Sequence, residues 1–439
     1  MEGNTKTVKN ISIKFLVHLF AILGFLLAAP HAKGLENHFK IEPARKISSE
    51  DMNCNYQVED FGRYCYNFEY PKLIIMNDSE PLVAFIDEQS NQLIISKISD
   101  KASHVIYSAS GFGKLFWDKW PIVYTKDKII YLSVYSGNSS PDKIKRIKFY
   151  QIDAESGKVN QDQLTFEADG RCSLWSIFPY KEQYLFIGNC NYICKKQLAS
   201  VLLGGNPTYY QNALFFLDEK QKLIRNPIEE KGCHNVFKQE YEIDDSDGIH
   251  AVWVKEEEGF GRGQNIIHYS SSLEGRVWSN PLEVYSVSLE DSTDYNQLYI
   301  SLAVSGDSAF VLWQDRKKGI SLSEIDRFGK VETVKISDKK EAKFNPMAVA
   351  STIKVASDKS GNVYVLWAQS FSKEYKLYFK ARIDGKWSSE MIVNQGSGRL
   401  KLPDMKVDEK GKVHIAYIKS IDPEEPNGKY GCFYMSMSP

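Results

Sequence analysis

The chain has 439 residues, enough for a large core, and 43% of them are hydrophobic, as in a folded protein. Lysine and arginine number 55 against 56 aspartates and glutamates, so the formal net charge is -1. This balance excludes a global attraction to nucleic acid or to an anionic membrane surface, and we expect no nucleic-acid partner.

The N-terminus has the three parts of a secretory signal. Lys6, Lys9 and Lys14 precede the apolar run 15–29, and small residues follow it. The run is shorter than the about twenty residues that span a bilayer, so a signal peptide over 1–32 is favoured over a retained anchor. We therefore predict a secreted or periplasmic protein with no transmembrane span in its mature chain.

The cysteine count is seven, which is odd. In an oxidising compartment some cysteines should pair, and Cys54 with Cys65 is the simplest local bridge. The odd count leaves at least one thiol free or intermolecular. Cys190 and Cys194 lack the paired spacing of structural zinc sites, so no metal site is predicted.

Residues 33–439 are predicted to form a single all-β domain built from one repeated unit. Apolar segments of the first half hold the second-strand position in each unit, at 82–88, 129–137 and 183–189. Four segments of the second half align better, at 244–256, 305–316, 357–370 and 408–420. Each of these four has a polar turn followed by an apolar strand with an aromatic residue, which is Trp253, Trp313, Trp367 or Tyr417.

Third and fourth strands complete most of the units. Third strands are expected at 266–272, 320–326, 376–384 and 432–438. Four antiparallel strands joined by turns are one blade of a β-propeller, so the units predict seven four-stranded blades over 71–439. Segment 33–70 contains the strand 38–48 that we expect to close the ring against the last, three-stranded unit. A six-bladed ring with an insertion at 172–233 is the alternative, and 52–70 and 189–212 are expected to be loops.

The turns between third and fourth strands resemble degenerate Asp boxes. Ser271-Ser-Leu-Glu-Gly275-Arg-Val-Trp278 keeps the Ser, Gly and Trp of that motif, with Leu273 where the Asp belongs. The chain thus resembles the sialidase-like propeller superfamily, also known for BNR repeats, in which these boxes are structural. The resemblance would imply three carboxylate-binding arginines and a Tyr-Glu nucleophile pair, and neither can be assigned to residues of this chain.

Candidate functional residues lie in or beside loops of the predicted blades, since loops on a rigid scaffold usually carry function. The catalytic candidates are Asp87, Glu88, Asp315 and Arg316, and the ligand-binding candidates are Trp117, Trp120, Arg262 and Glu374. The acidic turn 244–248 could bind structural calcium, but a tight hairpin turn is favoured, and no other cofactor is expected. Trp253, Trp313 and Trp367 recur at one strand position, so they are predicted to pack between blades.

The leading hypothesis is an exported, monomeric propeller that binds a protein or a carbohydrate on its channel face without catalysis. The alternative is a glycoside hydrolase or lyase of sialidase-like architecture that acts on extracellular glycans. Carboxylates from different blades would supply an acid and a base in that case.

Overall fold

The computed structural model describes a large part of the chain, in ranges separated by gaps. These ranges are 39–48, 52–53, 56–58, 62–64, 71–75, 80–87, 92–99, 102–110, 122–126, 129–135, 144–167, 171–180, 183–193, 208–217, 223–226, 235–257, 264–273, 277–288, 298–315, 318–338, 352–370, 374–398, 400–421 and 429–439. All regular structure within them is β-strand, which confirms the all-β prediction. No helix that could cross a membrane occurs in these ranges.

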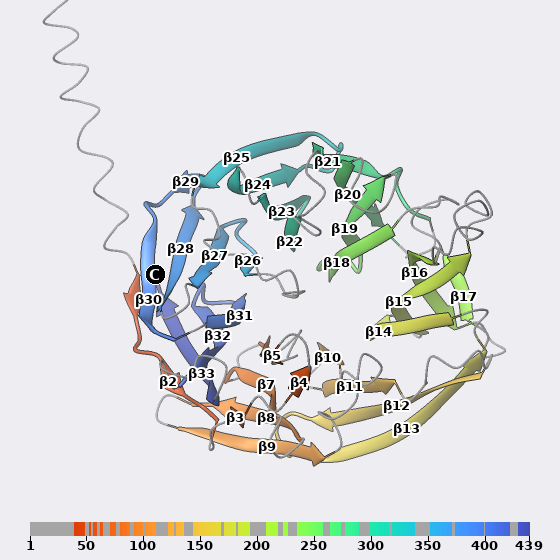
Figure 1. Cartoon of the computed structure of the whole chain (residues 1–439), viewed down its shortest axis with the longest axis horizontal. Helices are drawn as coiled ribbons and strands as arrows, with labels where there is room; N and C mark the ends of the chain where they lie inside the picture. The colour runs from red at the N-terminus through yellow and green to blue at the C-terminus, as the bar shows by residue number, and fades with distance from the viewer. Residues whose placement is uncertain are drawn as a thin grey trace, which may run out of the picture.

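Seven sheets of four or more antiparallel strands are present among the described residues, and Figure 1 shows them arranged around a common axis. The first three comprise β6 (Lys72–Ile74), β7 (Leu82–Asp87), β8 (Gln92–Ile98) and β9 (Ser103–Ser110); β10 (Ile122–Lys126), β11 (Ile129–Tyr135), β12 (Ile144–Asp153) and β13 (Val159–Glu167); and β14 (Arg171–Tyr180), β15 (Gln183–Ile193), β16 (Thr208–Leu217) and β17 (Leu223–Asn226). The described residues between 171 and 226 thus form a four-stranded sheet of their own.

The four sheets of the second half follow the same order. They comprise β18 (Asn235–Ile243), β19 (Ile249–Glu257), β20 (Gln264–Ser272) and β21 (Leu282–Ser288); β22 (Leu298–Ser305), β23 (Ser308–Asp315), β24 (Gly319–Ile325) and β25 (Val331–Ser337); β26 (Ile353–Ser357), β27 (Val363–Ser370), β28 (Glu374–Ile383), β29 (Lys386–Trp387) and β30 (Met391–Ser397); and β31 (Leu400–Val407), β32 (Val413–Ser420) and β33 (Lys429–Ser438). Figure 1 shows β10, β14, β18, β22, β26 and β31, the first strands of six sheets, on the side of the axis.

The N-terminal segment pairs with the last strand of the chain. Strands β1 (Lys40–Ile41) and β2 (Arg45–Lys46), from the segment expected to close the ring, both run antiparallel to β33. Residues 52–70 were expected to be loop, and this prediction was wrong in part. Strand β3 (Met52–Asn53) also pairs with β33, and β4 (Tyr56–Val58) forms a hairpin with β5 (Gly62–Tyr64). The pairing of β3 depends on a partner distant in the sequence, which local patterns do not reveal.

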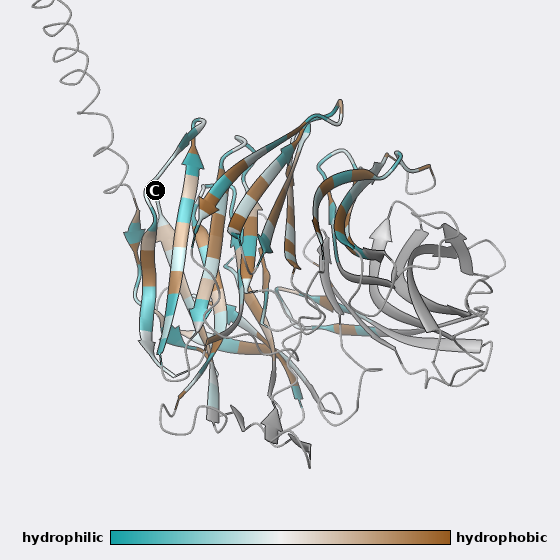
Figure 2. Cartoon of the chain, turned by 45° about the horizontal axis from the view of Figure 1, so that its top comes forward, coloured by the Kyte–Doolittle hydropathy of each residue, from teal (hydrophilic) through white to brown (hydrophobic). Residues whose placement is uncertain are grey.

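The core lies between neighbouring sheets, because each main cluster of buried apolar side chains draws on two adjacent sheets. Figure 2 shows hydrophobic and hydrophilic residues interspersed along the described strands. The predicted aromatic position is buried in every sheet of the second half. Trp313 and Trp367 belong to apolar clusters that join two neighbouring sheets, as predicted. Each of these rings stacks on a neighbour: Trp253 on His268, Trp313 on Tyr285, Trp367 on Tyr378 and Tyr417 on Phe433. One apolar cluster joins the first and last sheets, through Leu73 and Val83 on one side and Ile418 and Tyr434 on the other.

Candidate functional site

The two faces of the ring differ in how strands are connected. First-to-second and third-to-fourth connections share one end of each sheet, which we call the turn face. Second-to-third connections share the opposite end, which we call the loop face. At the turn face the connections are tight, as between Ser357 and Val363, whereas most loop-face connections lie outside the described ranges. Three loop-face connections, 136–143, 194–207 and 421–428, have eight residues or more, and ligand sites are usually built on such segments.

Several tight turns on the turn face are held by an aspartate at their first position. The Asp358 Oδ1 atom accepts hydrogen bonds from the backbone N–H groups of Ser360 (2.9 Å) and Asn362 (3.0 Å). Gly361 has a φ of 80°, which lets its own N–H bond the Asp358 carbonyl at 3.0 Å. Asp326 and Asp408 cap their turns in the same way. These aspartates stabilise hairpins, so their recurrence is a feature of the blades.

The acidic turn at 244–248 is a hairpin of this kind. Asp244 Oδ1 accepts hydrogen bonds from the N–H groups of Ser246 and Gly248, and Oδ2 lies 2.9 Å from His250 Nε2. The His250 Nδ1 atom lies 2.6 Å from the hydroxyl of Tyr269. Both Asp244 oxygens are thus engaged within the turn, and no metal-holding group of three or more His, Cys, Asp or Glu residues occurs in the described ranges.

Asp315 is the predicted catalytic residue that the structure describes most fully. It ends β23 at the loop face and is completely buried. Its Oδ2 atom accepts a hydrogen bond from the Tyr285 hydroxyl at 2.5 Å, and its Oδ1 atom accepts one from the N–H of Lys318 at 3.1 Å. Burial, together with the hydrogen bond and the charge of Asp315, raises the pKa of Tyr285, so that this phenol stays protonated as the donor. These contacts position the β23–β24 connection.

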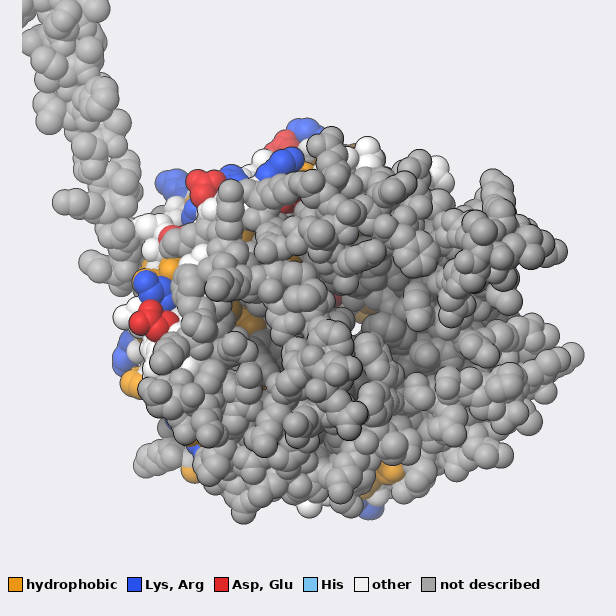
Figure 3. Space-filling model, viewed as in Figure 1, with side chains coloured by type: hydrophobic (Ala, Val, Ile, Leu, Met, Phe, Trp, Pro, Cys, Tyr) orange, Lys and Arg blue, Asp and Glu red, His pale blue; other side chains and the backbone are white. Residues whose placement is uncertain are grey.

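The other predicted site residues are only partly described. Asp87 ends β7 and Glu374 begins β28, so both belong to the loop face, and Glu374 is exposed. The remaining candidates lie outside the described residues: Glu88, Trp117, Trp120, Arg262 and Arg316, with Cys54 and Cys65 of the expected disulfide. Their roles stay predictions. At the margin of the ring in Figure 3, acidic and basic side chains of described residues are interleaved.

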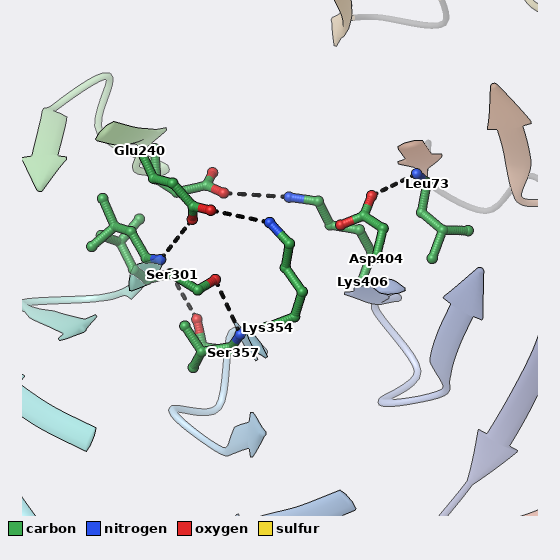
Figure 4. A network of polar contacts seen from close by, with 11 residues as sticks. Leu73, Glu240, Ser301, Lys354, Ser357, Asp404 and Lys406 are labelled. Carbon is green, nitrogen blue, oxygen red and sulfur yellow. Dashed lines mark hydrogen bonds and ion pairs between the residues drawn. The ribbon is translucent and has the colours of Figure 1, made fainter. Parts of the chain in front are cut away.

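A polar network near the axis was missed by the sequence reasoning. It comprises side chains of the first strands, which we call the axial network: Glu240, Glu242, Ser301, Lys354, Asp404 and Lys406 (Figure 4). Four of its members occupy one structural position in successive blades, because each pairs with the residue just before the buried aromatic of the second strand. These four are Glu240, Ser301, Lys354 and Asp404.

Three of these four side chains make the same hydrogen bond to the next blade. In each case a side-chain oxygen accepts a hydrogen bond from a backbone N–H of the first strand in the next blade. That N–H belongs to the residue that follows the equivalent structural position in this neighbouring strand. The bonds are Leu302 N to Glu240 Oε2 (2.9 Å), Val355 N to Ser301 Oγ (3.3 Å) and Leu73 N to Asp404 Oδ2 (2.7 Å). We call this bond the inter-blade clasp. The first strand of each sheet is an edge strand, so its N–H groups that point toward the axis have no neighbouring strand to bond. The inter-blade clasp gives three of these N–H groups an acceptor.

Lys354 interrupts the series, because an ammonium group has donors and no acceptor. Its Nζ atom donates instead to Glu240 Oε1 at 3.1 Å, past the intervening β22 sheet. Lys406 reaches farther around the axis and contacts Glu242 Oε1 at 3.4 Å. The side chains of Lys354 and Glu240 are 19% and 26% exposed, against 44% and 34% for Lys406 and Glu242. The Lys354–Glu240 pair is therefore the better shielded from water.

Both lysines of the axial network remain cations at neutral pH. Burial alone would lower the pKa of Lys354, but the charges of Glu240, Asp404 and Glu242 outweigh it and raise that pKa above the usual lysine value. The charge of Glu242 likewise raises the pKa of Lys406 against the effect of burial. A lysine that acts as a general base needs a lowered pKa. These two lysines can therefore bind or neutralise an anion, and they are unsuited to removing a proton.

Comparisons with solved structures find chains of similar fold. The chain aligns with the polysaccharide lyase Uly1 at a TM-score of 0.50, over 91% of this chain and 99% of the lyase, with 10% identity. An α-L-arabinanase from Penicillium chrysogenum aligns at 0.41, over 90% and 98%, with 9% identity. A PL25 ulvan lyase aligns at 0.39, over 68% and 78%, with 10% identity. At such identities the likeness to Uly1 establishes the β-propeller fold alone.

No family model and no curated protein matches this chain by sequence. The resemblance to the sialidase-like superfamily therefore remains a prediction from the degenerate turn motifs. The β-propeller fold itself is shown by the sheets and by the structural comparison.

Proposed function

We propose that this chain is a glycan-processing enzyme that cleaves a uronate-containing polysaccharide at the loop face. The observation that carries the proposal is the alignment with a polysaccharide lyase over nearly the full length of both chains. We therefore favour the alternative hypothesis, a glycoside hydrolase or lyase, over the leading hypothesis of a propeller that only binds its ligand. The segments between second and third strands can vary in such a fold while the blades stay constant, which is how one scaffold acquires a substrate site.

Elimination is the reaction that we favour. A base removes the proton beside the uronate carboxylate, the bond to the neighbouring sugar oxygen breaks, and a carbon–carbon double bond forms while the leaving oxygen takes up a proton. The carboxylate must be neutralised for that proton to leave, and an arginine does this with two parallel hydrogen bonds. Arg262 and Arg316, both in second-to-third connections, are our candidates for this role.

Hydrolysis by a carboxylate pair is the second candidate reaction, and the described carboxylates give it less support. Asp315 is buried and bonded through both oxygens, and both oxygens of Glu240 are engaged by Leu302 and Lys354. A carboxylate in this state is not available to protonate a glycosidic oxygen. Glu88 and Asp87 remain as acidic candidates at the loop face.

The test is an assay of the full chain against uronate-containing polysaccharides and neutral arabinans. Elimination is detected as ultraviolet absorbance of the unsaturated product, and hydrolysis as new reducing ends without that absorbance. We expect absorbance to rise with a uronate polymer, and Arg262→Ala or Arg316→Ala to lower kcat/KM at least tenfold, about 1.4 kcal/mol of transition-state stabilisation. Binding of a polysaccharide without cleavage would restore the non-catalytic hypothesis.

Export is part of the proposal, because polysaccharides of this kind lie outside the cell. It is supported by the basic start, the apolar run 15–29 and the small residues after it, all of which precede the described residues. Sequencing the N-terminus of the protein recovered from the culture medium or periplasm tests it. A mature chain that begins near residue 33 is expected, and an intact N-terminus in the cytoplasm would contradict export.

A further inference from the structure

Two cysteines of the third described sheet occupy directly opposite positions. Strands β14 and β15 run antiparallel, and their register pairs Cys172 with Cys190. The register is fixed on both sides, since Arg171 pairs with Asn191 and Ser173 with Asn189. The irregularity in this ladder comes later, between Leu174 and Ser176. The sequence had not suggested this pair, because 17 other residues separate the two cysteines along the chain.

The backbone geometry of such a pair suits a disulfide. Opposite residues of an antiparallel ladder have Cα atoms about 4.5–5.5 Å apart and share one face of the sheet. Disulfides require a Cα separation of about 4.4–6.8 Å. No shift of the strands is therefore needed to bring two cysteines at these positions within bonding range.

We propose that Cys172 and Cys190 form a disulfide bond. The reaction joins the two sulfurs and releases two electrons and two protons. A small or protein-borne disulfide, such as glutathione disulfide, accepts both and is reduced to two thiols by way of a mixed disulfide. Such an oxidant is present in the compartments to which secretory signals lead. The proposal is independent of the enzymatic activity.

The bond has a place in the fold that connects it to the loop face. Cys172 follows the first residue of β14, and Cys190 lies near the end of β15, where the chain leaves for the segment 194–207. The disulfide would join the innermost strand of this blade to its neighbour at the loop-face end. It therefore fixes the base from which one of the connections at the proposed substrate face departs.

Cys432 provides an internal control for this proposal. It is a free thiol, fully buried in the apolar cluster that joins the first and last sheets. Burial raises the pKa of this thiol far above its usual value, so it is poorly reactive as a thiolate. In the folded protein Cys432 should remain reduced and resist alkylation under conditions that oxidise the proposed pair.

The experiment is peptide mapping of the full chain after equilibration in a buffer of reduced and oxidised glutathione. Thiols are blocked, the protein is digested without reduction, and cross-linked peptides are identified by mass spectrometry. We expect one cross-link between the peptides of Cys172 and Cys190, and an unlinked peptide with Cys432. Recovery of Cys172 or Cys190 as a blocked thiol in folded protein, or linked to any other cysteine, would overturn the proposal.

Thiol counting on variants provides a second measurement that does not depend on the digest. In denaturant, Cys172→Ser should show one more free thiol than the parent chain, because Cys190 loses its partner. The double variant, Cys172→Ser with Cys190→Ser, should return to the parent count. A count one lower than the parent in Cys172→Ser would contradict the bond, because Cys172 would then be a free thiol in the parent. This holds even if a variant is less stable, since the count is made on unfolded chains.

Discussion

Replacing Glu240 by alanine tests whether the inter-blade clasp stabilises the ring. The substitution removes the acceptor of the Leu302 N–H, which is buried and points away from its own strand partner. A hydrogen bond to a charged acceptor contributes about 1.5–3 kcal/mol when its loss leaves a buried group unsatisfied. The ion pair with Lys354 adds at most about 1 kcal/mol, because both side chains retain contact with water. We expect Glu240→Ala to lower the free energy of unfolding by about 2–4 kcal/mol.

Glu242→Ala is the matched control. This residue lies on the same strand and also pairs with a lysine, but its contact with Lys406 is longer and no backbone N–H bond to it is present in the described residues. A loss of about 0–1 kcal/mol is expected. Denaturant titrations followed by circular dichroism and by tryptophan fluorescence would measure the free energy of unfolding of both variants. The comparison requires that the variants and the parent chain have the same m-value. Equal losses in the two variants would refute a stabilising role of the clasp.

Two further predictions concern a buried histidine and a strained glycine. Burial lowers the pKa of His414, while Asp408 opposes this effect and the charge of Lys412 adds to it, so the unfolded chain takes up this proton more readily than the folded one. The free energy of unfolding should therefore be highest above the ordinary histidine pKa of about 6.5 and fall as the pH drops below it. His414→Gln should reduce this dependence of stability on pH, and His104→Gln, at an exposed histidine, is the control. An unchanged dependence in His414→Gln would show that His414 does not contribute. Gly319 has a φ of 89°, and a Cβ there would lie 2.5 Å from the Ser337 carbonyl oxygen, whereas Gly306 has a φ of 55° and open space around it. Gly319→Ala should cost about 2 kcal/mol more than Gly306→Ala in the same titration, and equal costs would contradict the close approach.

The blades were predictable because their signals are local. The polar turn before Trp253, Trp313, Trp367 or Tyr417 and the alternation of the strands lie within short windows of sequence, and the predicted second strands match β19, β23, β27 and β32 closely. Strand order then follows from the turns, since antiparallel neighbours need only short connections.

The axial network could not be predicted in the same way, because its partners come from different blades. Lys354 and Glu240 are 114 positions apart, and Leu73 and Asp404 are 331 apart. A faint signal was present, since each of the four first strands has a polar residue at one aligned position. Aligning the first strands by the aromatic of the following strand would have brought Glu240, Ser301, Lys354 and Asp404 together. Their partners are nevertheless backbone groups and neighbouring blades, which only the closed arrangement of sheets defines.

The same reasoning explains why Asp315 was chosen from sequence as an accessible carboxylate. Its position at the end of an apolar strand indicated a loop residue, and it does end β23 at the loop face. The contacts that bury it come from Tyr285 of β21 and from the backbone of Lys318. Tyr285 belongs to the preceding blade, so the packing that encloses this carboxylate depends on how two blades meet.

Product analysis with a uronate-containing polysaccharide tests the central claim most directly. The full chain is incubated with the polymer, and the shortened products are examined by mass spectrometry and by ultraviolet absorbance. The account predicts oligosaccharides that end in an unsaturated uronate, with loss of this activity in Arg262→Ala or Arg316→Ala. A chain that is folded and binds uronate and neutral polysaccharides but leaves every polymer intact would contradict it.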